Sequence, residues 1–225
     1  MNVQENGPAL RAKWKILIVD DHALVRRGLA TMIGDEPDLE VCGEAGDGVE
    51  AMSQLGVVRP DLVVVDLSLR NGHGLDLIRQ IRARDAGIKL LVLSMHDEKL
   101  FAERALRAGA LGYINKEEAT GRVIDAIRQV LAGKVYVSPA MTERLLRRAT
   151  GEEAEAQLPS ERLSDRELTV FQMIGQGLAT REIAERLHLS VKTIETYREH
   201  IKAKLGLKNS AELSRHAAQW VLENS

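Results

Sequence analysis

Short apolar runs alternate with stretches of helical spacing through the first part of this chain of 225 residues. The apolar runs span 15–21, 38–47, 61–67, 88–94 and 111–116, and the run at 38–47 is the weakest. Helical apolar spacing fills the intervals at 23–33, 49–56, 75–83, 98–108 and 120–131. This alternation predicts successive right-handed βαβ units, and therefore a five-stranded parallel sheet with helices on both faces.

Five polar residues stand where four of these runs stop, namely Asp20, Asp21, Asp66, Ser94 and Lys116. In open α/β sheets the ligand site lies at the carboxyl ends of the strands. If the strands are parallel neighbours, these side chains converge on one edge of the sheet. Three carboxylates held close together repel one another, so we expect them to bind a hard divalent cation, for which Mg²⁺ is the best candidate.

Asp66 ends the most apolar strand and is the candidate nucleophile of this cluster. Carboxylates form aspartyl-phosphate intermediates, and Lys116 would screen the charge of an incoming phosphoryl group. Ser94 is placed to donate a hydrogen bond to a phosphoryl oxygen. Each residue alone has a plainer interpretation, because Asp and Ser commonly cap helices. Their coincidence at four strand ends favours a phosphoryl site.

Two histidines, His22 and His73, flank the expected site. A hard, oxygen-rich site disfavours imidazole ligands, so neither is predicted to bind the metal. We expect both to be solvated loop residues.

Composition limits the cellular compartments in which we expect the protein. The one cysteine, Cys42, excludes an internal disulfide framework and favours a reducing compartment. No apolar stretch reaches the ~20 residues of a membrane span, and the first residues lack the apolar core of a signal peptide. We therefore expect a cytoplasmic protein with no membrane partner.

The net charge of −2 excludes a uniformly basic nucleic-acid-coating protein, so any DNA contact must come from a local patch.

The part of the chain beyond residue 137 requires a second domain. Residues 140–148 have helical spacing, whereas 149–161 are acidic, small and proline-containing, as in an exposed linker. Residues 163–223 read as four short helices with no strand pattern. Ser164 and Glu167 predict a capping box at the first of these helices, and Ser190 is the expected N-cap of the third.

The third of these helices, at 191–205, has an apolar side and a long polar side. Its core positions are expected to be Val191, Ile194, Ile201 and Leu205. Residues 190–208 contain five Lys or Arg and two Glu, a local net charge of +3. Two helices joined by a tight turn, the second with a polar face, indicate a helix-turn-helix. An ordinary amphipathic helix with a solvated face has the same pattern.

The fourth helix, at 209–222, carries an apolar stripe of Leu213, Ala217 and Trp220. The stripe suits a self-complementary dimer contact and the core of the domain equally well.

Residues 15–137 resemble the receiver domain of two-component response regulators, and Asp20 to Arg26 are similar to the NarL/FixJ subfamily. The resemblance implies a flavodoxin-like doubly wound domain. It further implies these roles: Asp66 as phosphoacceptor, Asp21 as direct Mg²⁺ ligand, Asp20 acting on the metal through water, the Ser68 backbone carbonyl as a further metal ligand, Ser94 as switch hydroxyl, Tyr113 as switch aromatic, and Lys116 as phosphate-contacting lysine. Gly74 matches the loop glycine of the family. Arg70 stands where the family usually has proline, so we expect a less rigid loop.

Residues 162–225 resemble the LuxR-type DNA-binding domain through LSDRE at 163–167, GLATREIA at 177–184, LSVKTI at 189–194 and KLGL at 204–207. The resemblance implies that the third helix enters the major groove. Phosphate contacts are then expected from Lys192, Thr193 and Lys202, and positions near base edges from Glu195, Thr196, Arg198 and Glu199. The two glutamates either accept from cytosine N4 or pair with Lys192 or Lys202.

These resemblances together imply a transcription factor with a receiver domain at 15–137, a linker at 138–161 and a DNA-binding domain at 162–225. A sensor histidine kinase would phosphorylate Asp66, with Mg²⁺ as cofactor. The added charge would pull Ser94 and Tyr113 inward and free or dimerise the DNA-binding domain. The implied partners are the kinase, promoter DNA, a second copy of the chain and, as a further candidate, RNA polymerase.

Two rival functions stay open on the sequence. One is a phosphatase or phosphotransferase that uses Asp66 as a turnover nucleophile, against which Ser68 occupies the place of the second carboxylate that such enzymes need. The other is a DNA-binding protein whose receiver serves only as a phosphorylation-independent dimerisation module. We expect a self-catalysed phosphoacceptor and not a turnover enzyme.

Overall fold

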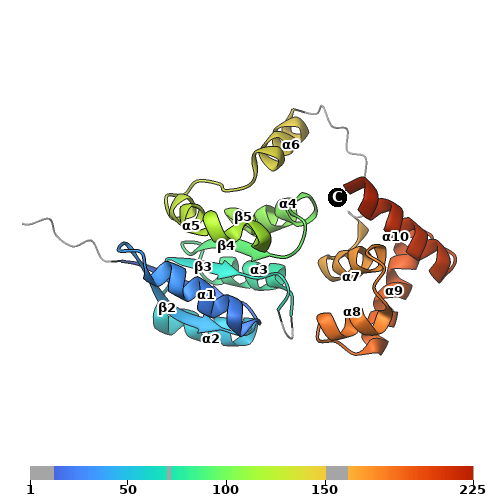
Figure 1. The fold of residues 1–225 in the computed structure, drawn as a ribbon, viewed down its shortest axis with the longest axis horizontal. Helices are drawn as coiled ribbons and strands as arrows, with labels where there is room; N and C mark the ends of the chain where they lie inside the picture. Colours follow the sequence, from blue (N-terminus) through green and yellow to red (C-terminus); the bar gives the residue numbers. More distant parts are fainter. Residues whose placement is uncertain (1–12, 70–71, 151–161, 225) are drawn as a thin grey trace, which may run out of the picture.

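The structure, a computed structural model, describes residues 13–69, 72–150 and 162–224. Its first domain is built on one parallel sheet with the strand order β2-β1-β3-β4-β5 (Figure 1). The strands are β1 (Trp14–Val19), β2 (Leu39–Ala45), β3 (Leu62–Val65), β4 (Lys89–Ser94) and β5 (Gly112–Asn115). The predicted five-stranded sheet is confirmed, including the weak run that forms β2. Successive strands are added on opposite sides of β1, so the strand order reverses between β1 and β3, and such sheets hold their ligands at this point.

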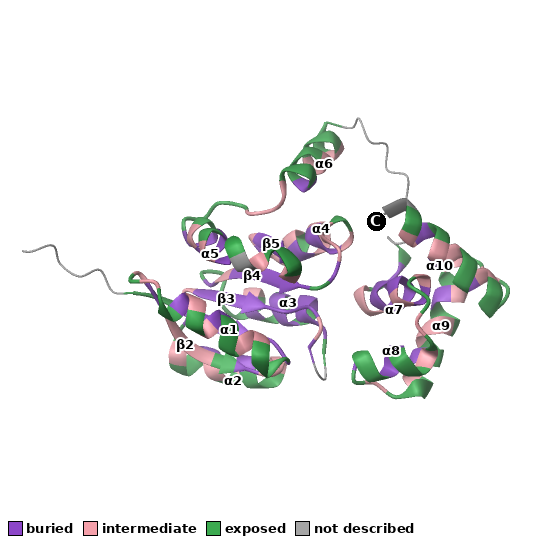
Figure 2. Ribbon diagram, in the orientation of Figure 1, coloured by how far each residue is buried: buried purple, intermediate pink, exposed green. Residues whose placement is uncertain are grey.

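Alternate residues of each strand pack against helices on opposite faces of the sheet. Ile16 and Ile18 of β1 share a core with α1 (Ala23–Gly34) and α5 (Val123–Leu131). Leu17 and Val19 share the other core with α2 (Gly48–Val58), α3 (Gly74–Arg84) and α4 (Glu98–Ala108). The central strands are buried on both faces (Figure 2), which explains their near-continuous apolar sequence.

The segment after β5 differs from the predicted helix at 120–131. A 3₁₀ helix, η1 (Lys116–Gly121), precedes α5. The Asn115 side chain accepts a hydrogen bond of 2.9 Å from the backbone N–H of Glu117. A side-chain oxygen at this position starts a tight turn directly after the strand. Asn115 therefore fixes where Lys116 leaves the sheet.

Helix α6 (Pro139–Ala149) follows the first domain, close to the predicted helical stretch. Ser138 caps it by accepting from the backbone N–H of Met141, whose side chain is buried. The rest of the expected linker, at 151–161, lies outside the described residues.

The second domain contains four helices, α7 (Asp165–Gly175), α8 (Thr180–Arg186), α9 (Val191–Leu205) and α10 (Ser210–Asn224). The predicted capping box is present, because the Ser164 hydroxyl accepts from the Glu167 N–H and the Glu167 carboxylate accepts from the Ser164 N–H. The helical domain is as predicted. The prediction that Val191 is a core residue is wrong, because its side chain is exposed. Ile194 and Ile201 are buried and hold α9 against the core.

Gly74 begins α3 directly beside the loop that follows Asp66. Its N–H donates to the Leu67 carbonyl at 2.9 Å. A Cβ atom at this position would lie 2.2 Å from the Asp66 carbonyl oxygen, closer than any side chain tolerates. Glycine is therefore required for the start of α3 to pack against the Asp66 loop. Arg70 and Asn71, in the same loop, lie outside the described residues.

His73 is buried, contrary to the expectation that it is a solvated loop residue. Its Nδ1 accepts a hydrogen bond from the Leu75 N–H and so caps α3. The ring is stacked against Phe101. Burial, with added repulsion from Arg166 and His96, lowers the pKa of His73 to about 3. The ring is consequently neutral at neutral pH.

Among the described residues, no helix has the length and apolar character needed to cross a bilayer.

Replacing Gly74 by alanine should destabilise the first domain by about 1–3 kcal/mol, because the new methyl group meets rigid backbone and not a movable side chain. Gly72→Ala is the matched control, since a Cβ there has nothing within 4 Å. Urea unfolding of both variants measures the difference. Equal stability of the two variants would contradict the packing argument.

Replacing His73 by asparagine should flatten the loss of stability in acid. The wild-type ring stays neutral down to about 3, whereas in the unfolded chain it takes up a proton near 6.5, so stability falls as the pH drops through this window. The wild type should lose up to about 1.4 kcal/mol more per pH unit than His73→Asn, which keeps a capping acceptor. Urea unfolding at a series of pH values tests this, and parallel pH profiles would refute it.

Candidate functional site

Three carboxylates meet at the carboxyl edge of the sheet, as predicted. The strand ladder continues past β1 and β3, because the Asp20 N–H donates to Ala45 at 3.1 Å and the Asp66 N–H donates to Val19 at 2.8 Å. These bonds fix the backbone under both side chains. Asp20, Asp21 and Asp66 are all buried, and they offer ligand atoms within 4.8 Å of one another.

Lys116 lies between two of these acids. Its Nζ is 2.6 Å from Asp20 Oδ2 and 2.8 Å from Asp66 Oδ2. Burial and repulsion from Asp66 raise the pKa of Asp20. Burial alone would lower the pKa of Lys116, but attraction to Asp66 and Asp20 outweighs it and the pKa is raised. The ammonium group therefore stays charged and offsets part of the repulsion.

The acid cluster fits a magnesium ion. Asp66 Oδ1 is buried and has no hydrogen-bond partner among the described residues, so one carboxylate oxygen is left for another ligand. The cluster offers oxygen atoms, which hard cations prefer. The exposed His22 ring adjoins it, with Nδ1 2.8 Å from Asp21 Oδ1. We read His22 as a partner of the carboxylate, since imidazole is a poor ligand for a hard ion.

Ser94 and Tyr113 are both buried and are joined through the backbone of His96. The Tyr113 hydroxyl donates to the His96 carbonyl at 2.8 Å, and the His96 N–H donates to Ser94 Oγ at 3.3 Å. Burial, followed by the charge of Asp66, raises the pKa of Tyr113, so its hydroxyl stays a neutral donor. The expected inward movement of Tyr113 is not needed here, because the side chain is already 1% exposed.

His96 is a site residue that the sequence analysis missed. Its Nε2 lies 3.0 Å from Ser68 Oγ in a hydrogen bond, and its ring packs on Phe101 at 4.7 Å between centroids. The Ser68 side chain thus has a partner of its own, beside the metal role expected of its carbonyl. The signal available in the sequence was a histidine two residues after the strand-ending Ser94.

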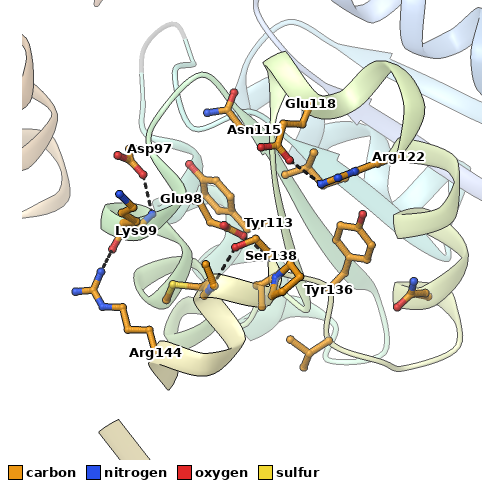
Figure 3. A pocket seen from close by; sticks show the side chains of 17 residues that line it. Asp97, Glu98, Lys99, Tyr113, Asn115, Glu118, Arg122, Tyr136, Ser138 and Arg144 are labelled. Atoms are coloured by element: carbon orange, nitrogen blue, oxygen red, sulfur yellow. Dashed lines mark hydrogen bonds and ion pairs between the residues drawn. The ribbon is translucent and has the colours of Figure 1, made fainter. Parts of the chain in front are cut away.

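The outer side of Tyr113 borders an open groove of about 760 Å³ between α4, β5 and α6 (Figure 3). Helix α6 is held to α4 at this groove. The Ser138 N–H donates to the Glu98 carboxylate at 2.7 Å, and Arg144 donates to the Lys99 carbonyl at 2.9 Å. Helix α6, which lies within the expected linker at 138–161, is therefore held against α4 at the groove that Tyr113 lines.

The second domain contains the expected helix-turn-helix in α8 and α9. His188 makes the turn in the left-handed region, with φ +52°, and Ser190 Oγ accepts from the Thr193 N–H at 3.0 Å to cap α9. The predicted DNA contacts lie on the sides of α9 that face away from its core. Four of these side chains are exposed, namely Lys192, Glu195, Thr196 and Glu199. The other three, Thr193, Arg198 and Lys202, are partly buried.

One of the two glutamates on this helix has a local partner. Glu199 Oε1 lies 2.9 Å from Lys202 Nζ. This pairing was one of the two alternatives left open. It leaves Glu199 less available for base recognition, whereas Glu195 is simply exposed.

The apolar stripe of α10 belongs to the core of the domain. Leu213 and Ala217 are fully buried, Trp220 is 4% exposed, and Trp220 packs against Phe171 at 5.4 Å between ring centroids. The structure thus favours the core over a dimer contact for this stripe.

Comparison with known protein families agrees with both domains. Residues 16–128 match the response regulator receiver domain, and residues 161–217 match the bacterial regulatory proteins of the luxR family. The oxygen regulatory protein NreC of Staphylococcus carnosus (strain TM300) is 39% identical over 208 residues, which cover 90% of this chain and 96% of that protein.

Solved structures with the same fold include a LuxR-family two-component response regulator from Aurantimonas sp. SI85-9A1. It is 34% identical with a TM-score of 0.57, and the match covers 62% of this chain and 99% of that one. RcsB from Salmonella enterica serovar Typhimurium, bound to promoter rprA in the presence of phosphomimetic BeF₃⁻, has a TM-score of 0.60 at 24% identity, covering 92% of this chain and 98% of that one. The latter likeness concerns the fold alone. The sequence matches show that this chain belongs to the response regulators of two-component systems, in the NarL/FixJ family with a LuxR-type DNA-binding domain.

Proposed function

We propose that this transcription regulator is switched by phosphorylation of Asp66, with Mg²⁺ as cofactor and a sensor histidine kinase as donor. The observation that carries the proposal is the state of the Asp66 carboxylate. One oxygen is 2.8 Å from Lys116, and the other is buried without a partner among the described residues. The candidate nucleophile, Asp66, thus already lies beside the Lys116 ammonium group, which would screen the charge of a phosphoryl group.

In the proposed step an Asp66 carboxylate oxygen attacks the phosphorus of a phosphohistidine on the kinase. The new O–P bond forms as the P–N bond breaks, and the imidazole leaves with the electron pair and takes a proton from solvent. A bound Mg²⁺ would stabilise the charge on the transferring phosphoryl group. Asp21, Asp66 and the Ser68 carbonyl would hold the ion directly, and Asp20 would act on it through water.

Lys116 and Ser94 then hold the transferred group. Lys116 has Asp20 as a second anchor, so it can turn from Asp66 Oδ2 to a phosphoryl oxygen without losing every partner. Ser94 can exchange its hydrogen bond with the His96 N–H for one to the phosphoryl group. Both moves replace existing contacts, which favours a switch between two arrangements.

We propose that the protein is a self-catalysed phosphoacceptor and not a turnover enzyme. A phosphatase of this design would need a general acid two residues after the nucleophile. That position is Ser68, whose hydroxyl is bound to His96.

The proposed output is promoter binding by α9. Lys192, Thr193 and Lys202 would meet phosphates, and Thr196, Arg198 and Glu195 would lie nearer to base edges. We further propose that phosphorylation promotes a homodimer, which must use a surface other than the buried stripe of α10. RNA polymerase is then the natural partner of the promoter-bound protein.

Acetyl phosphate and Mg²⁺ should label the wild type stoichiometrically and strengthen its genomic footprint. Asp66→Asn should show neither effect, and chelation of Mg²⁺ should abolish labelling of the wild type. Asp125→Asn, an exposed carboxylate on α5, should behave as the wild type. Regulation by Asp66→Asn at the wild-type level would refute the switch, and sustained phosphate release from small phosphomonoesters would revive the enzyme hypothesis.

Lys192→Ala should weaken binding to a random-sequence duplex as well as to a target site, because a phosphate contact carries no sequence information. The slope of log K against log salt concentration should become shallower by about 0.9. Lys134→Ala, an exposed lysine of the first domain, serves as the control. An unchanged slope for Lys192→Ala, measured by fluorescence anisotropy, would remove Lys192 from the interface.

A further inference from the structure

We propose that Glu195 sets the base preference of α9, and that it selects a C·G pair by accepting a hydrogen bond from the exocyclic amine of cytosine. This inference rests on the proposed function, because it names the base that the promoter-binding helix reads. The sequence placed two glutamates, Glu195 and Glu199, among the expected base contacts. The structure gives them different surroundings.

Three of the four side chains expected near base edges are engaged or partly buried. Glu199 Oε1 lies 2.9 Å from Lys202 Nζ, so its charge is already paired. The Thr196 hydroxyl donates to the Lys192 carbonyl at 3.0 Å, so its hydrogen is used within the helix. Arg198 is partly buried. Each of these side chains would have to give up a contact or move before it could read a base.

Glu195 is the fourth, and its carboxylate is open to solvent. Among residues 13–69, 72–150 and 162–224, no hydrogen bond or ion pair involves its side chain. Lys192, in the preceding turn, is exposed and forms no ion pair with it. Glu195 also lies in the first half of α9, and the N-terminal part of a recognition helix is the part that reaches base edges.

An unpaired carboxylate on this side of α9 has a cost in DNA binding. DNA phosphates are negatively charged, so the carboxylate repels every duplex whatever its sequence. The repulsion is offset only where a base edge offers the carboxylate a hydrogen. Glu195 therefore lowers the affinity for most sites and spares those with the right base, which is how discrimination against wrong partners is built.

The edges of the bases in the major groove identify the favoured pair. An ionised carboxylate accepts hydrogen bonds and donates none. Guanine and thymine present acceptors, which repel it, whereas cytosine presents the N4 amine. Adenine also has an amine, at N6, but its N7 acceptor lies beside it and repels a carboxylate. Cytosine is thus the base that Glu195 accommodates best.

Selection from randomised duplexes by the full chain, with Mg²⁺ and BeF₃⁻ present, tests this preference. The wild type should enrich sites with C·G at one position, at which the other pairs bind about 10-fold more weakly. Glu195→Gln should shift this one position toward A·T, because an amide matches both N6 and N7 of adenine. The rest of the site should stay the same.

Two further variants separate base reading from a general effect of charge. Glu199→Gln makes the same charge change one turn later, and it should keep the preference for C·G because Lys202 already holds that carboxylate. Glu185→Gln, an exposed position on α8, is the matched control outside α9. Both should enrich the wild-type site.

A modified base tests the hydrogen bond itself. N4-methylcytosine still pairs with guanine, but its methyl group replaces the amine hydrogen on the major-groove side. At the selected position it should weaken binding of the wild type about 10-fold and leave binding of Glu195→Ala unchanged, as measured by fluorescence anisotropy. A merely structural role of Glu195 predicts no such dependence on one atom of the DNA.

The inference is overturned if Glu195→Gln enriches the same base as the wild type at every position. It is also overturned if N4-methylation changes the affinities of the wild type and Glu195→Ala by factors that agree within about 2-fold. In either case a site enriched by the wild type still supports promoter binding, and only the role of Glu195 falls. If the wild type enriches no site, the proposed promoter binding falls together with this inference.

Discussion

The balance of charge at the carboxyl edge of the sheet is the constraint on which the rest of the structure depends. Asp20, Asp21 and Asp66 are buried within reach of one another, and Lys116 bridges two of them. Two like charges about 4 Å apart cost about 4 kcal/mol near a protein surface, against a total stability of about 5–15 kcal/mol. Lys116 offsets part of this repulsion, and its contacts with Asp20 and Asp66 join the carboxyl ends of β1, β3 and β5.

Much of this edge could be predicted because parallel strands bring their carboxyl ends together whatever the loops do. The positions of Asp66, Ser94 and Lys116 at this edge could be predicted from the strand pattern alone. The burial of His73 could not be predicted, because it depends on α3 and α4 packing over the loop and on Phe101 beneath the ring. His96 was missed for the same reason: its partners Ser68 and Tyr113 are distant in sequence. The exposure of Val191 reflects the position of the first turn of α9, which periodicity alone does not fix.

The contacts between the two domains connect the acid cluster of the receiver to the DNA-binding domain. Asp165 joins α7 to two helices of the receiver, and His188 approaches Asp21 itself. The DNA-binding domain is thus held partly by residues of the site that phosphorylation would change. In this account the state of Asp66 and the freedom of α9 are two readouts of one equilibrium.

The distance between the domains tests this account most directly. Spin labels on Ser53→Cys of α2 and Arg181→Cys of α8, both exposed positions, in a Cys42→Ser background, report the separation in the full chain. If modification of Asp66 releases the DNA-binding domain, the distance distribution is narrow without ligand and becomes longer and broader with Mg²⁺ and BeF₃⁻. An unchanged narrow distribution, with BeF₃⁻ shown to be bound at Asp66, would contradict it.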